Sequence, residues 1–106
     1  MIAQIQPAEL KRMLDAGQLV LLLDVRQPEE HAFCALPGSV LIPLGELMMR
    51  VEEVQANGAT VVVYCHHGVR SLSGAAILAR AGIEAVSLAG GIDRWSLTVD
   101  ESVPRY

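Results

Sequence analysis

Short runs of consecutive apolar residues alternate along the chain with segments whose apolar residues recur at helical spacing. Continuous apolar runs are typical of strands that are buried on both faces of a parallel sheet. The predicted strands are residues 2–6, 19–25, 39–42, 60–64 and 84–88. Repeated strand–helix units of this length predict one α/β domain, residues 1–106, with a parallel sheet, helices on both of its faces and right-handed crossovers.

Apolar residues at positions i, i+3 and i+4 predict the helices between these strands. The predicted helices run from Pro7 to Gly17, from Pro43 to Asn57-Gly58, and over residues 72–79 before Gly82. The methionines of the middle helix are expected to fill the core, because flexible thioethers fit irregular gaps. Residues 27–30 begin a short helical turn, and the tail to Tyr106 has no clear period.

Composition and charge exclude several classes of function. The 106 residues are 52% apolar, but no window of 18 residues is uninterrupted, which argues against a transmembrane helix. Residues 1–6 lack the features of a signal peptide, so a cytoplasmic protein is expected. The net charge of −4 argues against a nucleic-acid partner and against a basic membrane patch. Two cysteines without metal-ligand spacing indicate a reducing compartment and no metal site.

The strand at residues 60–64 leads into a loop with the chemistry of an anion site. The loop reads Cys65-His66-His67-Gly68-Val69-Arg70-Ser71 and opens a predicted helix. Open α/β sheets bind ligands at the carboxyl ends of their strands, and a glycine turn before a helix directs amides inward. A thiol near cations and a helix N-terminus ionises readily. The alternative is a buried structural cysteine, but burial alone would not require two histidines and an arginine beside it.

This loop resembles the active-site loop of the rhodanese family, whose sulfurtransferases carry sulfur as a cysteine persulfide. It has six residues from Cys65 to Arg70, as in that family, whereas the loop of protein tyrosine phosphatases is one residue longer. Three other segments are similar to rhodanese motifs in the right order: residues 22–30, 36–43 and 90–95. The resemblance extends from about Ile5 to Trp95 and implies a three-layer fold with a five-stranded parallel sheet flanked by helices.

The resemblance also implies an activity. Cys65 would take a sulfane sulfur from thiosulfate or a similar donor and pass it to a thiol or to cyanide, with no metal or organic cofactor. The residues implied in binding the substrate and the persulfide are His66, His67, Gly68, Val69, Arg70 and Ser71. Arg26 either adds positive charge at the pocket mouth or pairs with a nearby carboxylate. Arg70 either stabilises the anion or braces the loop.

Two other functions remain open. The first is a sulfur-relay module that exchanges sulfur with partner proteins and has little thiosulfate activity. The second is a phosphatase or arsenate reductase, against which the six-residue loop argues.

The chain departs from the family pattern at Cys34-Ala35, where a glycine and a histidine are customary. The departure puts in doubt any role of that histidine in the pocket, but it leaves the cysteine loop intact. Cys34 is expected to be a small apolar core residue. The alternative is a resolving thiol that forms a disulfide with Cys65. Trp95 is expected to anchor the packing of the last motif.

Overall fold

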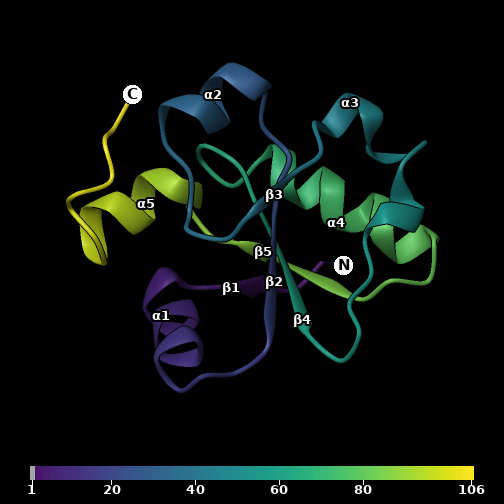
Figure 1. Ribbon diagram of the computed structural model, residues 1–106, viewed down its shortest axis with the longest axis horizontal. Helices are drawn as coiled ribbons and strands as arrows, with labels where there is room; N and C mark the ends of the chain where they lie inside the picture. The colour runs from purple at the N-terminus through teal and green to yellow at the C-terminus, as the bar shows by residue number, and fades with distance from the viewer. Residues whose placement is uncertain (1) are drawn as a thin grey trace.

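The computed structural model describes residues 2–106 and contains a five-stranded sheet with the order β1-β5-β4-β2-β3 (Figure 1). All neighbouring strands are parallel. The strands are β1 (Gln4–Ile5), β2 (Val20–Asp24), β3 (Val40–Leu41), β4 (Thr60–Tyr64) and β5 (Ala85–Leu88). The helices are α1 (Pro7–Asp15), α2 (Pro28–Phe33), α3 (Leu44–Leu47), α4 (Arg70–Arg80) and α5 (Gly91–Thr98), with a 3-10 turn at Val51–Glu53. The predicted five-stranded parallel α/β fold is confirmed.

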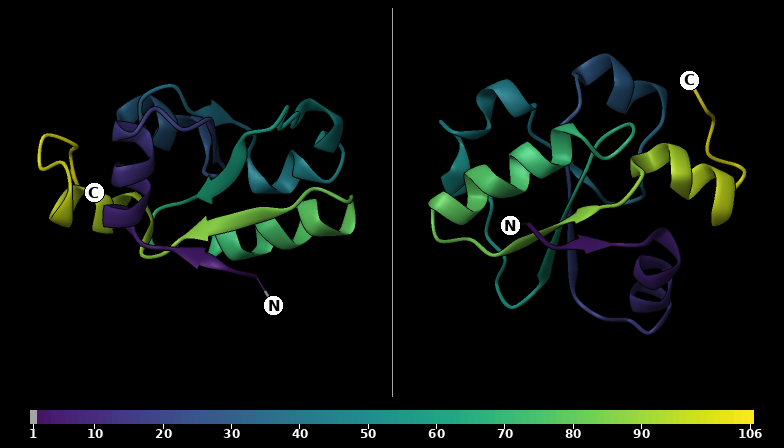
Figure 2. Two further views of the ribbon diagram at one scale, coloured as in Figure 1. Left: turned by 90° about the horizontal axis from the view of Figure 1, so that it is seen from below. Right: turned by 180° about the vertical axis from the view of Figure 1, so that it is seen from behind.

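Helices cover both faces of the sheet because its central strands are apolar on both sides. In β4, Val62 and Tyr64 join the core beneath α1 and α5, whereas Val61 and Val63 join the core beneath α3 and α4. Figure 2 shows α4 crossing one side of the sheet, with α1 and α5 lying together at the other end of the molecule. The period-2 alternation of a strand therefore decides which helix each side chain meets.

The helix predicted from Pro43 to Asn57-Gly58 is wrong in its extent. The chain forms only the short helix α3 and the separate 3-10 turn, and the backbone of Arg50 between them is not helical (φ −125°, ψ 20°). Met48 and Met49 are 66% and 84% exposed, so they do not fill the core as expected. Apart from Gly45, the segment consists largely of good helix formers, but after Pro43 only Leu47 and Val54 in it are buried. Its packing is therefore too sparse to sustain one long helix.

At the C-terminal side, Gly91–Thr98 forms the helix α5, which the sequence pattern did not predict beyond the motif itself. Trp95 on this helix is buried in the core shared with α1, as expected for a packing anchor. None of the helices in residues 2–106 has the length and apolar character needed to cross a membrane.

Candidate active site

Cys65 follows β4 directly, at the carboxyl edge of the sheet. Strand alternation directs its side chain into the core on the α4 side, where the residue is only 1% exposed. Its Sγ accepts hydrogen bonds from the backbone N–H of Gly68 at 3.1 Å and from that of Ser71 at 3.3 Å. The Ser71 amide belongs to the first turn of α4, whose N–H groups have no partner within the helix. The loop thus directs two peptide dipoles at one sulfur.

The turn of this loop depends on glycine at position 68. Gly68 has φ +94°, a left-handed conformation that other residues rarely adopt, and a Cβ there would lie 2.9 Å from the backbone nitrogen of Gly90. The loop can therefore lie against the backbone of the segment that enters α5.

The N-terminus of α5 holds the other side of the loop. The amide of Ile92 donates to the carbonyl of Cys65 at 2.9 Å, and the amide of Asp93 donates to the carbonyl of His66 at 3.1 Å. A Cβ on Gly91 would overlap both of these carbonyl oxygens. These two hydrogen bonds fix the start of the loop against α5. The amides of Gly68 and Ser71, later in the loop, donate to Sγ. The two glycines of the 90–95 segment thereby shape the loop from outside.

Two buried hydroxyls extend the environment of the sulfur. The thiol of Cys65 donates to Ser71 Oγ at 3.5 Å, and Ser71 Oγ lies 2.7 Å from Ser87 Oγ in β5. Both serines are fully buried. If Cys65 is ionised, Ser71 can donate to Sγ while accepting a hydrogen bond from Ser87, since each hydroxyl has one proton and two lone pairs. This hydroxyl pair can therefore serve either protonation state of the sulfur.

Arg70 does not present a free cation to the loop. Its guanidinium forms a bidentate pair with Glu30 of α2, with Nη1–Oε1 and Nη2–Oε2 distances of 2.7 and 3.0 Å. Hydrogen bonding to Arg70 is the largest influence on this carboxyl and lowers the pKa of Glu30 to about 2. The ion pair joins the last residue of the loop to α2 and matches the charge of Arg70 with an anion.

We expect Glu30→Gln to destabilise the protein in a pH-dependent way. The pKa of Glu30 is lower in the folded protein than its ordinary value of 4.5, so its contribution is complete above that value. It is lost as the pH falls toward about 2. Because solvent screens this partly buried ion pair, we expect the free energy of unfolding at pH 7 to fall by about 1 kcal/mol in the variant. Urea unfolding at pH 7 and at about pH 3 should show the difference between wild type and variant shrinking with acid. The exposed neighbour Glu29→Gln is the control, and a pH-independent difference would contradict the prediction.

The two loop histidines lie in different surroundings. His66 is half-buried, and its ring stacks on that of Tyr106 with a centroid distance of 3.8 Å and an interplanar angle of 6°. Burial, aided by the neighbouring His67, lowers the pKa of His66, so its imidazole is neutral at neutral pH. His67 is exposed, and so is Val69 near the start of α4. The rings of His66 and His67 therefore do not both enter the loop.

Arg26, for which the sequence left open a place at the pocket mouth or a carboxylate partner, is completely buried. Its guanidinium donates to both carboxylate oxygens of Asp24, at 2.9 and 2.7 Å, and to the carbonyl of Cys34 at 2.6 Å. Oδ2 of Asp24 also lies 2.8 Å from Nδ1 of His31. Of the two interpretations of Arg26, the structure favours the ion pair with a nearby carboxylate, which is that of Asp24.

The altered segment at Cys34-Ala35 is held by hydrogen bonds to buried side chains. Besides the Arg26 contact, the amide of Leu36 donates to the hydroxyl of Tyr64 at 3.1 Å. Burial raises the pKa of this hydroxyl to about 12, so it remains protonated. Cys34 and Cys65 are free thiols that belong to the cores on opposite faces of the sheet. A disulfide between them would therefore require backbone movement.

Among residues 2–106, no three His, Cys, Asp or Glu side chains are grouped so that they could hold a metal ion.

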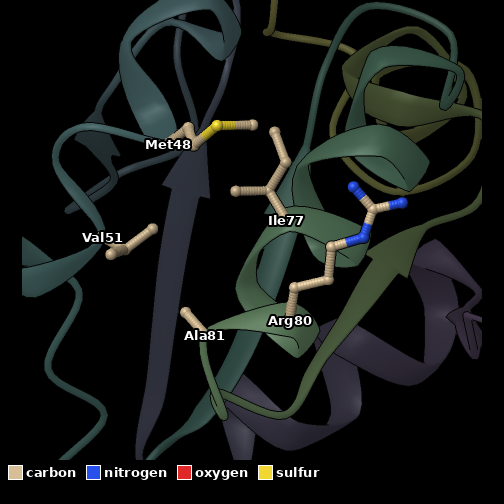
Figure 3. Close-up of a pocket in the computed structure, with 5 residues that line it drawn as sticks. All are labelled: Met48, Val51, Ile77, Arg80 and Ala81. Carbon is tan, nitrogen blue, oxygen red and sulfur yellow. The ribbon is translucent and has the colours of Figure 1, made fainter.

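A surface pocket of about 240 Å³ lies between the segment after α3 and the last turns of α4 (Figure 3). Its lining residues are Met48, Val51, Ile77, Arg80 and Ala81. Ile77 is seven residues beyond Arg70, about 10 Å along the helix. This pocket is therefore separate from the Cys65 loop, which lies at the opposite end of α4.

Sequence reasoning missed three residues around the loop. The sequence pattern assigns no role at the Cys65 loop to Glu30, Ser87 or Tyr106. A signal existed for Ser87, because a lone hydroxyl in an otherwise apolar strand indicates a buried hydrogen bond. Glu30 binds Arg70, which is 40 positions away in the sequence, and Tyr106 binds Glu30 across 76 positions. The sequence pattern contains no signal for contacts between residues so far apart.

The chain is also similar to known proteins. The chain is 33% identical to a sulfurtransferase of Allochromatium vinosum, over 91% of this chain and 90% of that protein. It is 33% identical to the adenylyltransferase and sulfurtransferase UBA4 of Yarrowia lipolytica over 97% of this chain, but spans only 26% of UBA4. The first curated relatives are thus about four times as long as the matched region.

The solved structure of a rhodanese-like domain protein from Staphylococcus aureus superposes with a TM-score of 0.84 and 30% identity, covering 99% of both chains. A model of the rhodanese-like domain matches residues 6–98, which include the Cys65 loop and the whole of α5. The chain therefore belongs to the rhodanese-like domain family.

Proposed function

We propose that this protein is a sulfurtransferase that carries a sulfane sulfur as a persulfide on Cys65, from thiosulfate or a similar donor to a thiophilic acceptor. The observation that carries the proposal is the pair of amides, from Gly68 and Ser71, that donate to Sγ. They stabilise a sulfur anion in a water-poor site, where preorganised dipoles are most effective. The family membership and the similarity to the Allochromatium vinosum sulfurtransferase support sulfur transfer as the reaction class.

The reaction is a double displacement. The Cys65 thiolate attacks the outer sulfur of thiosulfate; the new S–S bond forms as the donor's own S–S bond breaks, and sulfite leaves with the electron pair. The persulfide that results carries its negative charge on the terminal sulfur. An acceptor such as cyanide then attacks this sulfur, thiocyanate leaves, and the Cys65 thiolate is restored. The covalent intermediate divides one difficult transfer into two easier steps.

The residues of the loop have distinct parts in this scheme. The amides of Gly68 and Ser71 stabilise the thiolate before attack and after discharge. Ser71 Oγ follows the charge by donating to the sulfur, with Ser87 behind it. Arg70, paired with Glu30, mainly holds the loop against α2, while His66 in its neutral form contributes a wall rather than a charge.

Intact mass spectrometry after thiosulfate treatment tests the proposal. We expect a gain of one sulfur atom, located on Cys65 by peptide mapping and removed by cyanide with release of thiocyanate. Cys34→Ala should gain the sulfur equally, because Cys34 lies in the core on the other face of the sheet. Sulfur that is found on Cys34 or that cyanide does not remove would contradict the mechanism.

A sulfur relay between proteins is the second candidate. It is favoured by the similarity to UBA4, which is named as both an adenylyltransferase and a sulfurtransferase and of which this chain matches about a quarter. A relay module would be loaded efficiently on Cys65 by a cysteine desulfurase and poorly by thiosulfate. Comparing the two loading rates on the same protein separates the candidates.

A further inference from the structure

The segment after α5 turns back toward the carboxyl edge of the sheet. Val103 is buried, and its carbonyl accepts a hydrogen bond from Ser96 Oγ at 2.6 Å. Arg105 pairs with Asp93 at an Nε–Oδ1 distance of 2.9 Å. These contacts hold the segment on α5 and bring residue 106 beside α2, where the yellow end of the chain runs in Figure 1.

Tyr106 is connected to both ends of the Cys65 loop. Its ring stacks on His66, the residue that follows Cys65. Its hydroxyl donates to Glu30 Oε2 at 2.8 Å, and Glu30 in turn holds Arg70, the last residue of the loop. The same hydroxyl accepts from Arg26 Nη1 at 2.7 Å. Tyr106 is thus attached directly to the start of the loop and, through Glu30, to its end.

The surroundings of the ring suit a movable cover. Phe33 at the end of α2 meets it edge-on, with a centroid distance of 5.8 Å. Yet Tyr106 remains 44% exposed, so its outer face is in solvent. Opening would cost two hydrogen bonds, the stack on His66 and the edge-on contact with Phe33, and water would replace part of the loss.

The loop beneath is closed in the conformation observed. Cys65 is 1% exposed, so a reagent can reach its sulfur only when part of the surrounding structure moves. Within the described chain, Nε2 of His66 is buried without a hydrogen-bond partner, although its ring is stacked on Tyr106. A buried polar atom without a partner costs free energy that a bound ligand can recover. This unsatisfied nitrogen belongs to the residue that follows the closed thiol and on which Tyr106 stacks.

We propose that Tyr106 is the specificity-determining residue of this site, a gate that admits small sulfur donors and acceptors and restricts bulky ones. Thiosulfate reaches Cys65 with little displacement of the ring, whereas a peptide-sized persulfide requires the ring to leave His66. The choice of donors rests on the proposed function; the gating of the thiol does not. Reagents that only alkylate the thiol therefore test the gate independently.

The first arm of the test compares two alkylating reagents on the reduced protein. Peptide mass spectrometry follows modification of Cys65 by iodoacetamide, which is small, and by a fluorescein maleimide, which is bulky. In Tyr106→Ala the maleimide rate should rise about tenfold, the effect of an increased open fraction, while the iodoacetamide rate rises much less. Tyr106→Phe keeps the stack and loses the hydroxyl contacts, so its rates should lie between. Leu97→Ala, which removes an exposed apolar side chain elsewhere on α5, is the control and should match wild type.

The second arm measures sulfur transfer from thiosulfate and from glutathione persulfide. Tyr106→Ala should raise kcat/KM for the glutathione donor about tenfold relative to thiosulfate. Equal changes for small and bulky reagents in both arms, or no change, would overturn the gate. If alkylation shows size selection but no donor loads Cys65, the gate stands and the proposed function fails. If donors load sulfur onto Cys65 but neither arm shows size selection, the proposed function stands and the gate fails.

Discussion

Replacing Cys65 by serine is expected to abolish sulfur transfer, with a fall in kcat/KM of about a thousandfold or more. Serine is similar in size and retains a hydrogen-bonding atom opposite the amides of Gly68 and Ser71, so the loop should keep its shape. An alcohol oxygen, however, is far less acidic than a thiol and does not form a persulfide. The loss is therefore a loss of chemistry rather than of structure. The measurement is thiocyanate formation from thiosulfate and cyanide.

The interpretation needs evidence that the variant is folded. The thermal unfolding midpoints of Cys65→Ser and wild type should agree within a few degrees, because a single buried thiol-to-hydroxyl change costs about 1 kcal/mol. Cys34→Ala controls for the second cysteine and should retain transfer. Substantial transfer by Cys65→Ser would show that another residue is the nucleophile.

Gly91→Ala should reduce transfer about a hundredfold, although residue 91 does not contact the sulfur. A methyl group there would overlap the carbonyl oxygens of Cys65 and His66, which α5 now binds through Ile92 and Asp93. The loop must move outward to make room, and its amides then no longer meet Sγ. Thiocyanate formation measures the loss. A slower reaction of Cys65 with iodoacetamide should accompany it, because the thiolate has lost its donors.

Gly17→Ala is the matched control for this change. Gly17 has a similar backbone conformation, with φ +74° against +63° for Gly91, but no described atom lies within 4 Å of the position that its Cβ would take. Both variants carry the strain of a left-handed residue, which costs about 1–2 kcal/mol of stability. Only Gly91→Ala should lose transfer, and equal activities in the two variants would contradict the role given to α5.

The parts of the site that lie close together in sequence were the ones that could be predicted from it. The strand β4, the loop and the start of α4 occupy twelve consecutive residues, and each has a strong local signal: β-branched residues, a glycine turn and a helical stripe. Local chemistry therefore placed Cys65 at a strand end with amides around it. The prediction that this cysteine is the nucleophile still awaits its test.

Prediction was poorer where the outcome depends on competition between local preference and distant packing. The stripe from Leu44 to Val54 has helical spacing, but only part of it finds a partner on α4, and the chain breaks at Arg50. Arg70 has no carboxylate near it in sequence, so its pairing with Glu30 follows only from the placement of α2 above the loop. The position of Tyr106 likewise depends on how the last segment folds back along α5.

The ion pair between Arg70 and Glu30 has a consequence for how a donor is captured. With that cation matched by an anion, and a surplus of four negative charges on the whole chain, the protein offers no long-range attraction to a dianion such as thiosulfate. What remains is the short reach of two peptide dipoles, which act only once the donor has arrived and which dissolved salt hardly weakens. A free dianionic donor therefore reaches the loop by diffusion without electrostatic steering. A donor delivered by a docked carrier would not need such steering.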